Sequence, residues 1–142
     1  MGKRILVIQG HPDPRPERLC RGLADAYHRS ALAAGYEVRV VDVTRIEFTS
    51  LRSRNEWEGP IPAILRELQE AIRWAEHLII YFPIWLGTMP ALLKGLLRAG
   101  AAPGIRDGSL RPRPLAEAAD RPDTDARERW IAKLAELGRN GT

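Results

Sequence analysis

One cysteine, three scattered histidines and no long apolar run limit what this chain of 142 residues can be. A single cysteine, Cys20, cannot form an internal disulfide framework, so a reducing, cytoplasmic compartment is expected. His11, His28 and His77 lie far apart in the sequence and show no metal-ligand spacing. The first apolar run, residues 5–8, is too short for a signal peptide or a membrane span. We therefore expect no metal site and no membrane insertion.

The chain also has little excess of charge of one sign. Its net charge is +4, from 22 Lys and Arg residues and 18 Asp and Glu residues that are interleaved along the chain. This distribution is typical of a solvated surface, so a nucleic-acid partner is not expected. The length and the hydrophobic content of 44% fit one domain with its own core, and we expect residues 1–142 to form a single domain.

Three segments have the pattern of strands in a buried parallel sheet. Residues 5–8 and 78–82 are short, almost wholly apolar runs, and residues 37–43 alternate and are rich in valine. Apolar positions at helical spacing predict helices between and after these strands, over residues 17–34, 62–77 and 91–97. Alternation of this kind predicts an α/β fold with helices on both faces of the sheet, joined by right-handed crossovers.

Two segments lack such periodicity. Residues 44–60 predict an ordered surface loop, in which Trp57 covers either a ligand or the core. Residues 100–123 are rich in Pro and Gly and predict a linker within the domain. After this linker, a last helix is expected from its apolar stripe of Trp130, Ile131, Leu134 and Leu137.

The loop after the first strand has the composition of an anion site. It joins a strand end to a helix start, where backbone N–H groups and the helix dipole favour a phosphate group. Arg15 and Arg18 could clamp phosphate oxygens with their guanidinium groups, whereas Glu17 adds an opposing charge. The candidate cofactor-binding residues here are His11, Arg15, Glu17, Arg18 and Leu19. The alternative is a solvated loop with two surface arginines.

The loop after the third strand could hold a planar ring. In open α/β sheets, ligands bind outside the carboxyl ends of the strands, and Trp85 follows such an end. An isoalloxazine ring needs a flat apolar wall and backbone donors, which Trp85 and the amides of the next two residues could supply. The candidate residues are Pro83, Ile84, Trp85, Leu86 and Gly87. Alternatively, Trp85 is a core aromatic residue at a strand end.

The tripeptide His11-Pro12-Asp13 also suggests a metal hydrolase. Zinc-dependent sugar N-deacetylases carry a similar His-Pro-Asp-Asp motif after their first strand. Here Pro14 replaces the second acid, and no later His-rich segment supplies another ligand. This alternative is therefore the weakest of those considered.

The motifs together resemble the flavodoxin-like NAD(P)H:quinone oxidoreductases, in particular the branch called modulator of drug activity B. The resemblance covers residue 4 to about residue 98 and lies in residues 10–14, 51–58, 72–77 and 81–93, in that order and spacing. Residues 127–134 and 137–139 resemble the last helix of that family. The fourth and fifth strands of the family have no counterpart here, since the Pro- and Arg-rich segment stands in their place.

The resemblance implies a flavodoxin-like, three-layer α/β/α fold and a bound FAD or FMN. It implies hydride transfer from NAD(P)H through the flavin to a quinone, and the sequence assigns no catalytic side chain. The alternative is a non-catalytic flavodoxin-like protein that binds a nucleotide or a protein partner. With about three strands in the order 2-1-3, the third strand becomes an edge, which we expect the linker and last helix, or a second chain in a homodimer, to cover.

Overall fold

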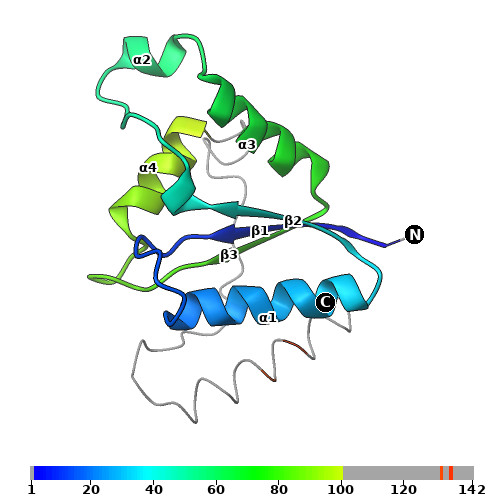
Figure 1. The fold of residues 1–142 in the computed structure, drawn as a ribbon. Coiled ribbons are helices and arrows are strands. Elements are labelled where there is room, and N and C mark those ends of the chain that lie inside the picture. Colours follow the sequence, from blue (N-terminus) through cyan, green and yellow to red (C-terminus); the bar gives the residue numbers. More distant parts are fainter. Residues whose placement is uncertain (1, 101–131, 133–134, 136–142) are drawn as a thin grey trace.

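The computed structural model describes residues 2–100 together with Ala132 and Ala135 (Figure 1). The predicted linker beyond Gly100 and the apolar stripe of the last helix lie outside the described residues. The elements in chain order are β1 (Arg4–Gln9), α1 (Leu19–Ala33), β2 (Glu37–Asp42), the 3-10 helix η1 (Val43–Arg45), α2 (Arg54–Glu58), α3 (Ala63–Trp74), β3 (His77–Tyr81) and α4 (Ala91–Gly100).

The three strands form one parallel sheet in the order β2-β1-β3, as predicted. The last residue of β1, Gln9, pairs with Asp42 of β2 and with Tyr81 of β3. The carboxyl ends of all three strands therefore meet at the same edge of the sheet. In the part of the chain that the structure describes, β3 is an edge strand.

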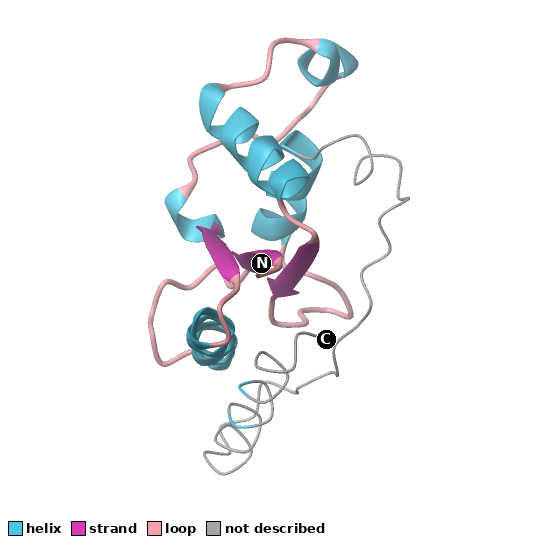
Figure 2. Cartoon of the chain, turned by 90° about the vertical axis from the view of Figure 1, so that its right-hand side faces the viewer, coloured by secondary structure: helices cyan, strands magenta, loops and turns pink. Residues whose placement is uncertain are grey.

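The central strand β1 is buried on both faces. Ile5 and Val7 pack with α1 on one side, whereas Leu6 and Ile8 pack with α3 and α4 on the other. Figures 1 and 2 show the resulting three layers, with α1 below the sheet and α3 and α4 above it. The predicted flavodoxin-like α/β/α fold is thus confirmed. No helix among residues 2–100 has the length and apolar content needed to cross a membrane.

The helices differ from the prediction mainly at their ends. Helix α1 begins at Leu19 rather than at residue 17, and Arg18 is its N-cap. Gly35, with φ +83°, follows its end as expected, because glycine adopts this left-handed conformation without a Cβ clash.

The prediction of a loop over residues 44–60 was incomplete, since this segment contains η1 and α2. A helix as short as α2 has too few turns for an apolar period to be visible in the sequence. Its start is defined locally, because the side chain of Ser53 accepts a hydrogen bond from the Glu56 N–H at 3.2 Å. Trp57 lies on this helix.

Gly10 occupies a position where no side chain fits. A Cβ at Gly10 would lie 2.6 Å from Leu93 Cδ2 and 2.9 Å from the Tyr81 carbonyl oxygen. We expect Gly10→Ala to lower the free energy of unfolding by about 2 kcal/mol, because the backbone oxygen cannot move aside. In the control Gly95→Ala, the new Cβ would lie 3.4 Å from Phe48, an ordinary contact, and the helix should gain about 0.5 kcal/mol. Urea unfolding measures both, and equal stabilities for the two variants would contradict this account.

Candidate functional site

The two loops predicted as binding sites meet at the carboxyl edge of the sheet. The rings of His11 and Trp85 lie edge to face, with centroids 5.8 Å apart and planes at 87°. Just before them, the Gly10 N–H donates to the Tyr81 carbonyl at 2.7 Å and ties the ends of β1 and β3 together. Residues more than seventy positions apart in the sequence are therefore in contact at this edge.

A tight turn shapes the loop that follows β3. The Trp85 N–H donates to the Thr88 carbonyl at 2.9 Å, and the Thr88 N–H donates back to the Trp85 carbonyl at 3.1 Å. Both central residues have positive φ, 50° at Leu86 and 76° at Gly87. Glycine adopts this conformation readily, whereas leucine is strained in it. The turn holds the Leu86 side chain fully in solvent.

The five predicted residues of this loop have different exposures. Pro83 is buried, Gly87 is exposed, and Ile84 and Trp85 are 46% and 45% exposed. Together with the exposed Leu86, the last two make an apolar tip beside His11. Covering neighbouring exposed apolar side chains with a ligand or a partner lowers the free energy, so such a group of side chains marks a candidate binding surface.

In the first loop, Asp13 binds both arginines that were predicted to clamp a phosphate. The Asp13 carboxylate accepts hydrogen bonds from Arg15 Nε and Nη2 at 2.8 and 2.6 Å, and from Arg18 Nε and Nη2 at 2.8 and 2.5 Å. The backbone N–H of Arg15, at 3.0 Å, is the largest cause that lowers the pKa of Asp13, and the Arg15 side chain lowers it further. The carboxylate is therefore bound by donors that could also bind a phosphate.

Three of the loop amides expected to bind phosphate donate within the loop. The Asp13 N–H donates to His11 Nδ1 at 3.0 Å, the Arg15 N–H to Asp13, and the Arg18 N–H to the Arg15 carbonyl at 3.3 Å. His11 itself is buried. Glu17 is exposed. Leu19 is the first residue of α1, and its half-buried side chain packs against the apolar cluster between that helix and the sheet.

The sequence did not single out Arg21 and Asp42, which form a buried ion pair under this loop. Arg21 Nη1 lies 2.7 Å from Asp42 Oδ2, and their side chains are 9% and 16% exposed. Although burial raises it, hydrogen bonds from Arg21 and Thr44 hold the pKa of Asp42 below its ordinary value. The sequence does contain a signal that could have identified Arg21. Its spacing from Ala24 and Ala31 places it on the buried face of α1.

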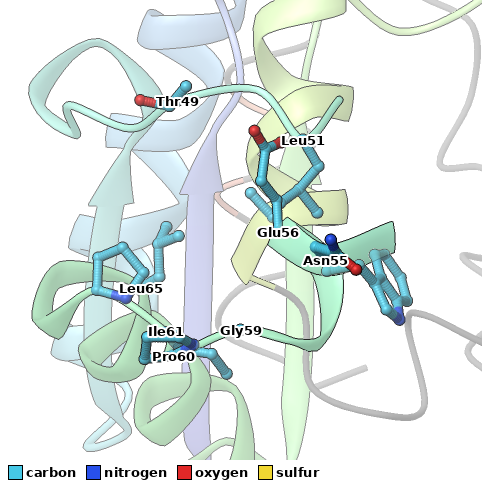
Figure 3. A pocket seen from close by; sticks show the side chains of 11 residues that line it. Thr49, Leu51, Asn55, Glu56, Gly59, Pro60, Ile61 and Leu65 are labelled. Carbon is cyan, nitrogen blue, oxygen red and sulfur yellow. The ribbon is translucent and has the colours of Figure 1, made fainter. Parts of the chain in front are cut away.

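A cavity lies away from these loops. It has a volume of about 480 Å³ and lies between α2, the segment that joins it to α3, and the last turn of α4 (Figure 3). Ala99, in the last turn of α4, lines it, whereas the loop that carries Trp85 precedes the first turn of the same helix. The two places are therefore separated by most of the length of α4, roughly 12 Å.

The parallel sheet, with both candidate loops at its carboxyl edge, has the arrangement of the open α/β folds in which ligands bind at that edge. A family model described as a flavodoxin-like fold matches residues 3–105. The chain therefore belongs to the flavodoxin-like fold family. The flavodoxin-like fold predicted from the resemblance is thereby confirmed.

One relative and two solved structures illustrate the similarity. A ribosyldihydronicotinamide dehydrogenase-like protein, traD, of Penicillium crustosum is 28% identical over 116 residues, which cover 65% of this chain and 41% of that protein. An NAD(P)H:quinone oxidoreductase from Methanothermobacter marburgensis has the same fold, with a TM-score of 0.72, 20% identity and 100% of both chains covered. An FMN-dependent NADH-azoreductase from Bacillus anthracis, in complex with FMN, gives a TM-score of 0.68 at 10% identity, and the match covers 97% of this chain and 98% of that chain.

The Arg21–Asp42 pair predicts that stability falls in acid. Because the pKa of Asp42 is lower in the folded state, the unfolded chain binds this proton first, and stability is lost as pH falls below about 4. We expect Asp42→Asn to remove about 3 kcal/mol at pH 7 and to lessen the loss between pH 6 and pH 3. Urea unfolding at several pH values measures both effects. The control Glu70→Gln removes one exposed carboxylate and should lose stability in acid as the wild type does. If the stability of Asp42→Asn falls as steeply with pH as that of the control, the prediction is wrong.

Proposed function

We propose that this chain is a flavin-dependent oxidoreductase that passes a hydride from NAD(P)H to a quinone, with FAD or FMN as cofactor. The observation that carries the proposal is the contact of His11 with Trp85, which joins an apolar loop tip to a loop with two guanidinium groups. A flavin nucleotide has the matching chemistry, since it carries a planar ring and, beyond the ribityl chain, a phosphate group. Family membership supports the same conclusion.

The residues at the edge fit this group. Trp85, Ile84 and Leu86 offer apolar surface that a ring would cover, and the turn leaves it open to solvent. Arg15 and Arg18 lie on the neighbouring loop and already hold a carboxylate, so a phosphate would take over donors that Asp13 now occupies. When bound, the flavin would supply the hydride chemistry, and the chain would bind and orient it.

The named relatives support the donor and acceptor in this proposal. The fungal relative is named for a ribosyldihydronicotinamide dehydrogenase, and a structure with the same fold is named an NAD(P)H:quinone oxidoreductase. The azoreductase structure contains FMN. Because the chain spans 41% of the fungal protein, the activity of the whole relative is part of the proposal for this chain. A cytoplasmic homodimer, as the single Cys20 and the β3 edge suggest, belongs to the same proposal.

A second candidate is a non-catalytic protein that binds a nucleotide or a protein partner. The specific observation in its favour is that Asp13 holds both arginines of the anion site. If that bond persisted, the loop would not bind a phosphate.

Flavin binding by the purified full chain tests the proposal. We expect the visible spectrum of added FMN or FAD to shift on binding, and NADPH or NADH to bleach it until a simple quinone restores the colour. Trp85→Ala should weaken flavin binding by about tenfold, the usual order for loss of one stacked aromatic side chain. Trp57→Ala, in the cavity beside α2, is the matched control and should bind as the wild type does. If the wild-type chain binds no flavin and NAD(P)H causes no bleaching, the result favours the second candidate.

The competition between Asp13 and phosphate gives another expected outcome. Asp13→Asn removes the negative charge that now lies between Arg15 and Arg18. We expect the dissociation constant of FMN to fall by about fivefold, whereas riboflavin, which lacks the phosphate, should bind as before. Fluorescence titration measures both ligands. Weaker FMN binding in this variant would mean that Asp13 instead organises the arginines for the ligand.

A further inference from the structure

Arg21 reaches from α1 into the protein and contacts two other segments. Its guanidinium group donates from Nε to the Asp13 carbonyl at 2.9 Å and from Nη2 to the His11 carbonyl at 3.3 Å. The same group donates to both carboxylate oxygens of Asp42, at 2.7 and 3.2 Å. One buried side chain thus links the first loop, the first turn of α1 and the end of β2.

The other end of this link is itself anchored. Asp42 is the last residue of β2, and its Oδ1 accepts from the Thr44 N–H at 3.0 Å and from the Thr44 hydroxyl at 2.7 Å. The carboxylate therefore has partners on both oxygens, and β2 is held in the sheet by its pairing with β1. Through Asp42, Arg21 connects the loop to the most regular part of the fold.

The two carbonyl groups that Arg21 binds belong to peptide units in which no N–H group offsets the negative charge of the oxygen. Each precedes a proline, Pro12 or Pro14, so neither peptide unit carries an N–H group. Carbonyl oxygens carry partial negative charge and repel a phosphate group, and here a buried cation binds them both. Fixing the Asp13 carbonyl also fixes where the chain turns toward Arg15.

We propose that Arg21 is a positioning residue, which holds the loop of residues 11–18 in the shape that binds the phosphate end of a flavin. It would thereby set the preference for FMN over riboflavin without touching the ligand. The inference rests on the proposed function and deepens it. Lysine cannot fully replace Arg21, because a single ammonium group cannot span a carboxylate and two carbonyls as the planar guanidinium group does.

Measuring FMN and riboflavin dissociation constants for the full chain tests this role. We expect Arg21→Gln to weaken FMN binding by about tenfold and to change riboflavin binding by less than about twofold, because riboflavin uses only the ring loop. Arg21→Lys should lie between the wild type and Arg21→Gln. A residue with a merely structural role would weaken both ligands alike, so the ratio of the two constants distinguishes the two roles.

The control is Arg29→Gln, which removes one exposed positive charge from the same helix, two turns further along. It should leave the ratio unchanged, which separates positioning from a general charge effect. If Arg21→Gln does not fold, Arg21→Lys and Asp42→Asn measure the same ratio. A wild-type ratio in these variants overturns the inference and leaves the proposed function standing. Equal binding of the two flavins by the wild type overturns the inference alone, and no binding of either overturns both.

Discussion

The burial of β1 on both faces is the constraint on which the other features depend. Ile5 and Val7 require a helix on one side, and Leu6 and Ile8 require helices on the other, so the three layers follow from one strand. Because β1 also pairs with a neighbour on each side, its end is the best-held point of the carboxyl edge. The loop with His11 and Asp13 begins there, and Gly10 lets β3 and α4 approach closely enough to bring Trp85 beside it.

Two sets of ionic contacts lie at this edge, and their magnitudes assign them different roles. Arg15 is 65% exposed where it meets Asp13, and an exposed pair of this kind contributes little to stability because water screens it. Arg21 and Asp42 are mostly buried, and breaking a pair of this kind costs about 3 kcal/mol or more. The buried pair therefore contributes more to holding the loop than the pair at Arg15, and the proposed exchange of Asp13 for a phosphate would leave the buried pair intact.

The pattern in the sequence predicted the strands and three of the helices, because apolar periodicity over many residues reports which faces are buried. The order of the strands followed from the resemblance to the flavodoxin-like family. The pattern did not predict α2, whose five residues are stabilised by one cap. It singled out Arg15, Arg18 and Trp85 as candidates, since their residue types suit a phosphate and a ring. It did not identify Asp13 as the partner of both arginines, because the conformation of a proline-rich loop depends on contacts with the rest of the protein.

The sequence by itself predicted the three strands, the helices between and after them, and the two loops that carry the candidate site. These follow from apolar spacing and residue type, which are local properties of the chain, whereas the fold family followed from the resemblance of the motifs to a known family. Only the tertiary structure decided that His11 contacts Trp85 and that Arg21 binds Asp42 beneath the loop. Both contacts join segments that the strand pairing brings together, and their distances are set by packing across the sheet edge rather than by spacing along the chain.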